Sequence, residues 1–280
     1  MTPTSSSVSS LAGLSGKTAI VTGSTQGLGA DVARVLASYG VNVVISGRNT
    51  DNGQALADEI NQTGAKRATF YQSDIQNDDD IQACIQHALS TFGGLNFLVN
   101  NACSYNDSGV QSSRQQWHET LGVNLVSAAM FCQFALPHLK RGSVIINMGS
   151  TGGKFGAAGR ALYPASKAAL MQFTRNLAVT VAADGIRALS VSPAWTWSPS
   201  VQKLSQGSRQ KADQVGAHFH PLGRVGDGAE IGQAIAFLCS DGASWMTGVD
   251  IPVDGGFSSL GPDQGIAPSQ WFTTLLQQKN

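Results

Sequence analysis

Three side chains between residues 150 and 167 have the types and the spacing to move a proton. Ser150 follows closely on the apolar run Val144–Met148, whose length and composition predict a buried strand. Tyr163 and Lys167 lie four residues apart at the start of a helical pattern, so they share one face of that helix. An ammonium group near a phenol favours the phenolate, and a serine hydroxyl beside it can hold a substrate oxygen. The three residues therefore predict a proton-transfer site for an alcohol or a ketone.

A glycine-rich turn near the N-terminus predicts a second functional element, a pyrophosphate site. An expected strand over Lys17–Thr22 precedes this turn, and an expected helix over Ala30–Tyr39 follows it. Glycines permit a tight turn and let the backbone approach a phosphate, and the helix N-terminus offers free N–H groups. The residues of this turn that we expect to contact a cofactor are Gly23, Ser24, Gln26, Gly27, Leu28 and Gly29.

The Gly-x-x-x-Gly-x-Gly spacing, together with the Ser, Tyr and Lys set, resembles the single-domain branch of the short-chain dehydrogenase/reductase family. The resemblance covers about residues 14–257. It implies that Tyr163 exchanges a proton with the substrate oxygen and that Ser150 orients this oxygen. It also implies that Lys167 hydrogen-bonds the nicotinamide ribose, and that Asn124 bends a helix and supports the proton path.

The same resemblance implies further cofactor contacts and reveals one departure. Asp74 and Ile75 follow an expected strand and, as in relatives, would contact the adenine ring. The family pattern Asn-Asn-Ala-Gly reads Asn-Asn-Ala-Cys here, so Cys103 stands where relatives keep the backbone bare beside the nicotinamide. We expect its side chain to narrow the pocket or to meet the substrate. The remaining cofactor contacts that the resemblance implies are Asn101, Ala102, Tyr163, Lys167, Pro193 and Thr196.

The residues after the expected strand Val41–Ser46 bear on the choice between NAD(H) and NADP(H). A NAD site typically places an acid about 20 residues after the glycine turn, on the ribose hydroxyls. The window 46–50 contains Arg48 and no acid, whereas Asp51 is better explained as a cap or first-turn acid of the next helix. Because arginine suits a bidentate phosphate contact, we expect NADP(H) to be preferred over NAD(H).

Composition limits the classes to which the protein can belong. Hydrophobic residues make up 42% and charged residues 13% of the 280 residues, typical of a globular chain. The 18 basic residues equal the 18 acidic ones, which argues against binding to nucleic acid or to an anionic membrane. No uninterrupted apolar run approaches the length of a membrane span. The cysteines and histidines show no metal-binding spacing, and expected buried thiols favour a cytoplasmic location.

The order of the expected elements predicts the fold. Strands alternate with helices, which indicates an α/β fold with a doubly wound parallel sheet (Rossmann-like) and helices on both faces. The resemblance implies about seven strands. We expect a flexible tail over residues 1–13, one dinucleotide-binding catalytic domain over 14–257 and a C-terminal extension over 258–280. Segment 194–226 has little periodicity and is expected to be a substrate loop with one short helix.

Aromatic side chains are expected to line an apolar substrate pocket. Trp195 and Trp197 belong to the expected substrate loop, as does Phe219, and Tyr105 and Phe155 would lie opposite. Packing in the core is the alternative explanation for each of these rings. The complete set of expected substrate contacts is Ser150, Tyr163, Cys103, Trp195 and Trp197.

The combined expectation is an NADP(H)-dependent oxidoreductase that interconverts a ketone and a secondary alcohol on a bulky or aromatic small molecule. One alternative is an NAD-dependent dehydrogenase of a hydroxysteroid or dihydrodiol, with the same site residues. Another is an NADPH-binding redox sensor without turnover, against which the intact Ser, Tyr and Lys set argues. Relatives are commonly tetramers, and Gln270–Gln277 predicts a helix with an apolar side. We therefore expect a homotetramer in which residues from about Pro262 onward pack on a neighbouring subunit.

Overall fold

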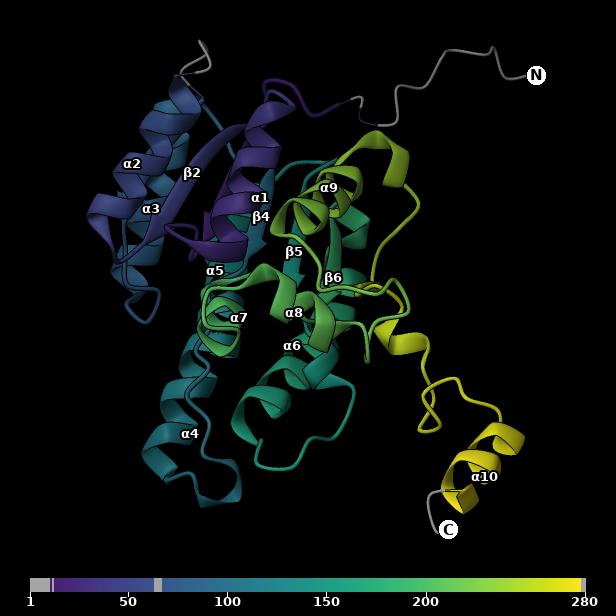
Figure 1. Ribbon diagram of the computed structural model, residues 1–280. Helices are drawn as coiled ribbons and strands as arrows, with labels where there is room; N and C mark the ends of the chain where they lie inside the picture. The colour runs from purple at the N-terminus through teal and green to yellow at the C-terminus, as the bar shows by residue number, and fades with distance from the viewer. Residues whose placement is uncertain (1–10, 12, 63–66, 278–280) are drawn as a thin grey trace, which may run out of the picture.

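The computed structural model describes residues 11, 13–62 and 67–277, so nearly all of the expected N-terminal tail lies outside the described residues. Strands and helices alternate from the first strand onward (Figure 1). The elements are β1 (Thr18–Thr22), α1 (Gly27–Ser38), β2 (Asn42–Gly47), α2 (Thr50–Asn61), β3 (Ala68–Gln72), α3 (Asp78–Phe92), β4 (Phe97–Asn100), α4 (Arg114–Leu121), α5 (Ser127–Ala135), β5 (Val144–Met148), α6 (Leu162–Val181), β6 (Arg187–Pro193), α7 (Pro199–Leu204), α8 (Arg209–Gly216), α9 (Gly228–Cys239), β7 (Asp250–Val253) and α10 (Pro268–Gln277).

The strands form one parallel sheet of seven, in the order β3-β2-β1-β4-β5-β6-β7. The chain starts at β1, moves outward to β3, then returns to pair β4 with the other side of β1. This reversal creates a switch point between β1 and β4, where ligands bind in open α/β sheets. The predicted doubly wound fold with about seven strands is confirmed.

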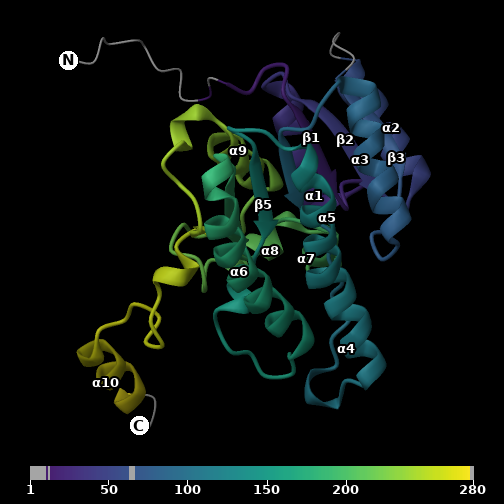
Figure 2. The same ribbon diagram turned by 180° about the vertical axis from the view of Figure 1, so that it is seen from behind.

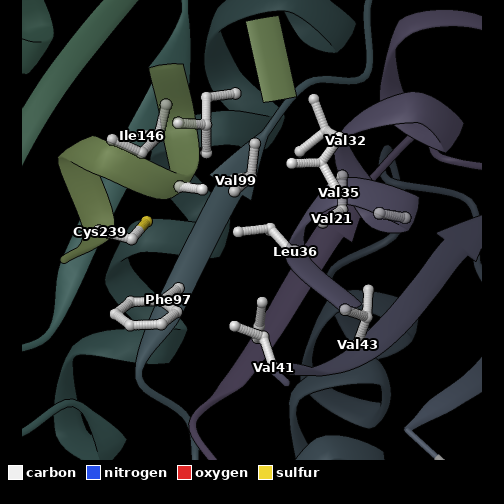
Figure 3. Packing of buried hydrophobic residues seen from close by; sticks show 14 of the residues in the cluster. Val21, Val32, Val35, Leu36, Val41, Val43, Phe97, Val99, Ile146 and Cys239 are labelled. Carbon is white, nitrogen blue, oxygen red and sulfur yellow. The ribbon is translucent and has the colours of Figure 1, made fainter. Parts of the chain in front are cut away.

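Helices cover both faces of the sheet because neighbouring strand residues point to opposite sides. On one face, Val21 and Ile146 pack with Leu36 of α1 and with α2 and α9 (Figure 3). On the other face, Ile20 packs with α3, α5 and α6, including Phe131. Burying one such side chain contributes about 1.5–3 kcal/mol. The two clusters therefore stabilise the sheet, whose strand ends carry the site.

The helical stretch after β4 is longer and more apolar than any uninterrupted run of apolar residues in the sequence indicates. Helices α4 and α5 join through a π-helical turn, Gly122–Val126, and a 3₁₀ turn extends the stretch to His138. The 25 residues from Arg114 to His138 would be long and apolar enough to cross a membrane, and their most apolar window has a mean hydropathy of 1.4. A core helix passes the same test, and Phe131 is 1% exposed against the sheet.

Segment 194–226 holds two short helices, α7 and α8, where a loop with one short helix was expected. The Ser198 side chain caps α7 by accepting from Val201 N–H, and Ser208 caps α8 by accepting from Lys211 N–H. Sequence periodicity missed one of the two because each helix spans at most about two turns and α8 is mostly polar.

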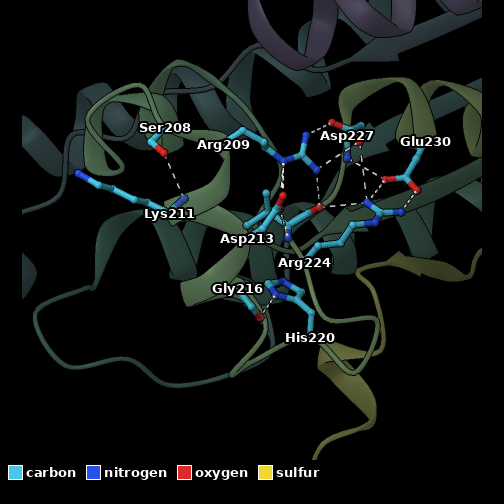
Figure 4. Close-up of polar contacts among 10 residues, drawn as sticks. Ser208, Arg209, Lys211, Asp213, Gly216, His220, Arg224, Asp227 and Glu230 are labelled. Atoms are coloured by element: carbon cyan, nitrogen blue, oxygen red, sulfur yellow. Dashed lines mark hydrogen bonds and ion pairs between the residues drawn. The ribbon is translucent and has the colours of Figure 1, made fainter.

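Charged side chains fix α8 to the start of α9 (Figure 4). Arg209 pairs with Asp213 in its own helix at 3.0 Å and also with Asp227, which precedes α9. Arg224 pairs with Glu230 at 2.6 Å, and this contact lowers the pKa of Glu230 to about 2. The network therefore holds α8 in a fixed position relative to α9.

The C-terminal extension ends in α10, which stands away from the body in both views (Figures 1 and 2). The helix expected over Gln270–Gln277 is present. Its apolar side chains Phe272, Leu275 and Leu276 are 68%, 53% and 61% exposed. Trp271 donates its Nε1–H to the carbonyl oxygen of Asp263 at 3.0 Å, so the extension has contacts of its own.

Candidate active site

The turn between β1 and α1 depends on glycine for its shape and for close approach. Gly23 and Gly27 have φ angles of +62° and +56°, which are unfavourable for residues other than glycine. A Cβ atom at Gly23 would lie 2.7 Å from Ala102 Cα, and one at Gly29 would overlap the amide of Asn101. The turn is therefore bare backbone pressed against the residues that follow β4.

The N-terminus of α1 fits a pyrophosphate. The N-cap residue Gln26 makes no side-chain capping hydrogen bond, so no side-chain cap occupies the first N–H groups of the helix. Free N–H groups and the positive end of the helix dipole favour an anion at this point.

Residues after β4 complete this cradle from the other side. Asn101 donates its Nδ2–H to the carbonyl oxygens of Thr22 and Gly23, at 2.9 and 3.1 Å. The backbone N–H groups of Asn101 and Ala102 both donate to Thr22 Oγ1. The Asn101 side chain thus holds the glycine turn in place.

A cavity of about 1660 Å³ opens beyond the carboxyl ends of the strands. Sites for one small ligand typically span about 300–1,000 Å³, so this cavity has room for a dinucleotide and a substrate together. The expected site residues that line it are Gly23, Gln26, Gly27, Leu28, Gly29, Arg48, Asp74, Ile75, Asn101, Ala102, Cys103, Ser150, Tyr163, Lys167, Pro193, Trp195 and Thr196.

Ser150, Tyr163 and Lys167 all line this cavity. Ser150 follows β5 closely and its Oγ accepts from Gly152 N–H at 3.0 Å. The Lys167 ammonium lies 5.7 Å from the centroid of the Tyr163 ring and donates to the carbonyl oxygen of Met148 at 2.7 Å. Tyr163 and Lys167 are 9% and 2% exposed. The shared helix face predicted from their spacing therefore places the ammonium beside the phenol ring.

Ser24 does not line the cavity, contrary to the expectation of a cofactor contact. Its side chain is fully buried, donates to the carbonyl oxygen of Val21 at 2.6 Å and accepts from Ser46 N–H at 3.1 Å. Because its hydroxyl group is used within the fold, Ser24 ties the glycine turn to β2.

Trp197 is also not brought to the cavity. Its ring lies against Arg209, whose guanidinium carbon is 5.7 Å from the ring centroid. Trp197 therefore packs against the start of α8 and does not make the expected substrate contact, whereas Trp195 lines the cavity.

Asn124 lies in the π-helical turn behind the cavity wall. Its side chain accepts from Ser104 N–H at 2.6 Å and donates to the carbonyl oxygen of Ser104 and to Ser166 Oγ. The amide is 1% exposed and links the loop after β4 to α6. In this structure Asn124 positions other groups and does not line the cavity.

Asp107 is a site residue that the sequence analysis missed. Helix α6 begins without a side-chain cap at Ala161. The Asp107 carboxylate takes this place from a distant loop, accepting from the N–H groups of Gly109, Ala161 and Tyr163 at 2.9–3.1 Å. Burial alone would raise the pKa of Asp107, but these hydrogen bonds outweigh it and lower the pKa. The uncapped start at Ala161 was the signal available in the sequence.

Aromatic rings form the remaining wall of the cavity. Tyr105 stacks on Tyr163 with a centroid distance of 5.0 Å and an interplanar angle of 22°. Trp195 contacts Phe219 at 5.0 Å, and all of these rings line the cavity with Phe155. The rings expected to form a substrate pocket, except for Trp197, thus line the same cavity as the proton-transfer residues.

A nucleotide cradle and a proton donor that meet over one substrate site suit the exchange of a hydride and a proton with a carbonyl group. By this fold and site the protein is an oxidoreductase of alcohols or ketones. A family model described as Enoyl-(Acyl carrier protein) reductase matches residues 23–258. The chain belongs to the short-chain dehydrogenase/reductase family, whose members use NAD(P)(H).

Several relatives match nearly the whole chain. L-fucose dehydrogenase from Oryctolagus cuniculus is 33% identical over 265 residues, which are 93% of this chain and 89% of the relative. Trans-4-hydroxycyclohexanecarboxylate dehydrogenase from Sinomonas cyclohexanicum is 35% identical over 247 residues, 86% of this chain and 92% of the relative. A solved glucose/ribitol dehydrogenase-type structure from Brucella melitensis has a TM-score of 0.80 and 32% identity, covering 87% of this chain and 97% of that one.

Proposed function

We propose that the protein is an NADP(H)-dependent oxidoreductase that interconverts a ketone and a secondary alcohol on a bulky or aromatic substrate. The observation that carries the proposal is the single cavity that holds both the glycine turn and the Ser150, Tyr163 and Lys167 set. The relatives with matching chains are named as dehydrogenases of hydroxyl-bearing compounds, which supports the same reaction type.

Each catalytic side chain has one task in this proposal. When bound, the nicotinamide would supply the hydride to the carbonyl carbon in reduction and accept it in oxidation. The Tyr163 hydroxyl gives its proton to the carbonyl oxygen in reduction and takes it back in oxidation. Ser150 donates a hydrogen bond to the same oxygen, and the Lys167 ammonium stabilises negative charge on the tyrosine oxygen.

The preference for NADP(H) rests on Arg48. This exposed side chain follows β2 and lines the cavity. Among the described residues, its guanidinium group has no hydrogen-bond partner in the protein, so its donors are available to a 2′-phosphate. No acid occupies positions 46–50 to bind the ribose hydroxyls of NAD(H).

Replacing Arg48 with Gln is expected to lower kcat/KM for NADPH by roughly ten- to a hundredfold, because a charge-assisted hydrogen bond contributes about 1.5–3 kcal/mol. The value for NADH should change little. Steady-state rates with both cofactors measure the ratio, and Arg114→Gln, an exposed arginine outside the cavity, is the matched control. Equal or higher efficiency of the wild type with NAD(H) would contradict the proposal and favour the NAD-dependent alternative.

Screening a panel of ketones and secondary alcohols by NADPH absorbance tests the reaction type and the shape of the substrate. Bulky and aromatic ketones should react best, because Tyr105, Phe155, Trp195 and Phe219 line the cavity. Turnover of small anionic keto acids alone would refute the proposed substrate shape.

We also propose a homotetramer in which the extension from about Pro262 packs on a neighbouring subunit. The exposed apolar side of α10 and its position away from the body support this proposal. Truncation after Phe257 is expected to reduce the assembly to smaller species, as measured by light scattering. A monomeric full-length protein, or a truncated chain with unchanged assembly and activity, would refute it.

A further inference from the structure

We propose that the substrate carries a carboxylate on its bulky body and that Arg160 binds this carboxylate. The inference rests on the proposed function, the exchange of a hydride and a proton at Ser150, Tyr163 and Lys167. It adds the chemical class of the substrate: a ketone or secondary alcohol with one anionic group away from the reacting carbon.

Arg160 lies immediately beside the proton donor. It belongs to the loop before α6 and lines the same cavity as Tyr163. Its guanidinium carbon lies 5.4 Å from the centroid of the Tyr163 ring. An anion held by Arg160 would thus lie next to the tyrosine whose hydroxyl meets the substrate oxygen.

Asp107 forms an ion pair with Arg160 but accepts no hydrogen bond from the guanidinium group. The Arg160 Nε lies 3.7 Å from Asp107 Oδ2, which is an ion pair but too long for a hydrogen bond. The Asp107 oxygens already accept backbone N–H groups, including those of Ala161 and Tyr163. The Asp107 side chain is 1% exposed and that of Arg160 is 45% exposed. The cavity therefore meets the guanidinium and not the carboxylate.

The chemistry of this surface favours a carboxylate. A guanidinium group presents a planar fork of N–H donors that matches a carboxylate with two parallel hydrogen bonds. Because the ion pair with Asp107 offsets part of the charge of Arg160, this surface suits the single negative charge of a carboxylate better than a phosphate dianion. The surrounding rings, Tyr105 and Trp195 among them, would contact the apolar remainder of the molecule.

Lys211 is the rival cation on the substrate side. It lies on α8 and lines the cavity, but its ammonium group already donates to Gln206 Oε1 at 2.9 Å. Arg48 follows β2 and belongs to the nucleotide end. Glu119, an acid of the lining, accepts from Gln115 at 2.8 Å. Lys211 is thus the matched control for Arg160.

The test compares pairs of ketones that differ only in charge. Values of kcat/KM for 4-acetylbenzoate and 4-acetylbenzamide, and for the 3-acetyl pair, are measured with wild type, Arg160→Gln, Arg160→Lys and Lys211→Gln. The wild type should prefer each acid over its amide by roughly ten- to a hundredfold. This ratio should fall towards one in Arg160→Gln, recover in part in Arg160→Lys and persist in Lys211→Gln. Any loss common to both substrates, from a shift of Tyr163, cancels in the ratio.

Calorimetric titration of the protein with the same acids separates binding from turnover. Arg160-dependent binding of an acid without turnover of any ketone would contradict the proposed function and support this inference. Equal turnover of acid and amide by the wild type would do the reverse. Loss of the ratio in Lys211→Gln but not in Arg160→Gln would overturn the assignment, as would an absence of both binding and turnover.

Discussion

Replacement of Tyr163 by Phe is expected to lower kcat by roughly 10²–10⁴-fold, the usual contribution of a positioned acid or base. The change removes only the phenolic oxygen. The ring would still stack on Tyr105 and lie near the Lys167 ammonium, so the fold and the cofactor affinity should remain close to those of the wild type. Steady-state rates with a reactive ketone, together with cofactor titration, measure the two effects separately.

Tyr39→Phe is the matched control for this prediction. Its hydroxyl donates to Gln233 at 2.6 Å, outside the cavity, so removing it changes an exposed hydrogen bond and should not affect turnover. A Tyr163→Phe protein with kcat near that of the wild type would show that another group transfers the proton.

Replacement of Asp107 by Ala is expected to reduce both stability and turnover. Removing a buried charged acceptor leaves the backbone N–H groups of Gly109, Ala161 and Tyr163 without this partner, at a cost of about 1.5–3 kcal/mol in the free energy of unfolding. The start of α6 carries Tyr163, and a misplacement of about 1 Å can cost roughly 10²-fold in rate. Urea denaturation and kcat measure the two effects.

Asp107→Asn separates the charge of this residue from its shape. The amide keeps one acceptor oxygen, so the kcat of this variant should lie between those of the wild type and Asp107→Ala. Unfolding that is unchanged in Asp107→Ala, with normal kcat, would contradict the capping role.

The pH dependence of stability follows from the same carboxylate. Its folded-state pKa is lowered from the ordinary value of 3.8. The ionised form therefore stabilises the fold fully above that value, and this stability is lost as the pH falls through the lower folded-state pKa. The difference in unfolding free energy between wild type and Asp107→Asn should shrink on acidification from neutral pH to below 3.8. A difference that stays constant would contradict the assignment.

The fold was predictable because its signals are local. Apolar runs marked the buried strands, and the glycine turn marked the first crossover, so the doubly wound sheet was expected. One of the two short helices of segment 194–226 was missed because both are short, and α8 is also held by Asp227, which lies 18 residues from Arg209. Propensity in so short and polar a segment does not record such a partner.

The same distinction explains the outcome for the site. Ser150, Tyr163 and Lys167 were found because helical spacing fixes the last two and a strand end marks the first. Asp107 was missed because the N–H groups of Ala161 and Tyr163, which it accepts from, lie 54 and 56 residues further on. Ser24 was assigned to the cofactor because the sequence does not show that the Ser24 hydroxyl accepts a hydrogen bond from Ser46 N–H.

The pairing of β1 with β4 has a consequence for synthesis of the chain. The glycine turn is synthesised early, but Ala102, which packs against it, lies 80 residues beyond Thr22. A nascent chain that ends before β4 has the turn without its second wall. A bound dinucleotide stabilises only chains that can bind it, so it cannot stabilise a nascent chain that has not yet reached Ala102. The cofactor can therefore stabilise chains in which both walls of the cradle have folded, but not the shorter chains that come before them.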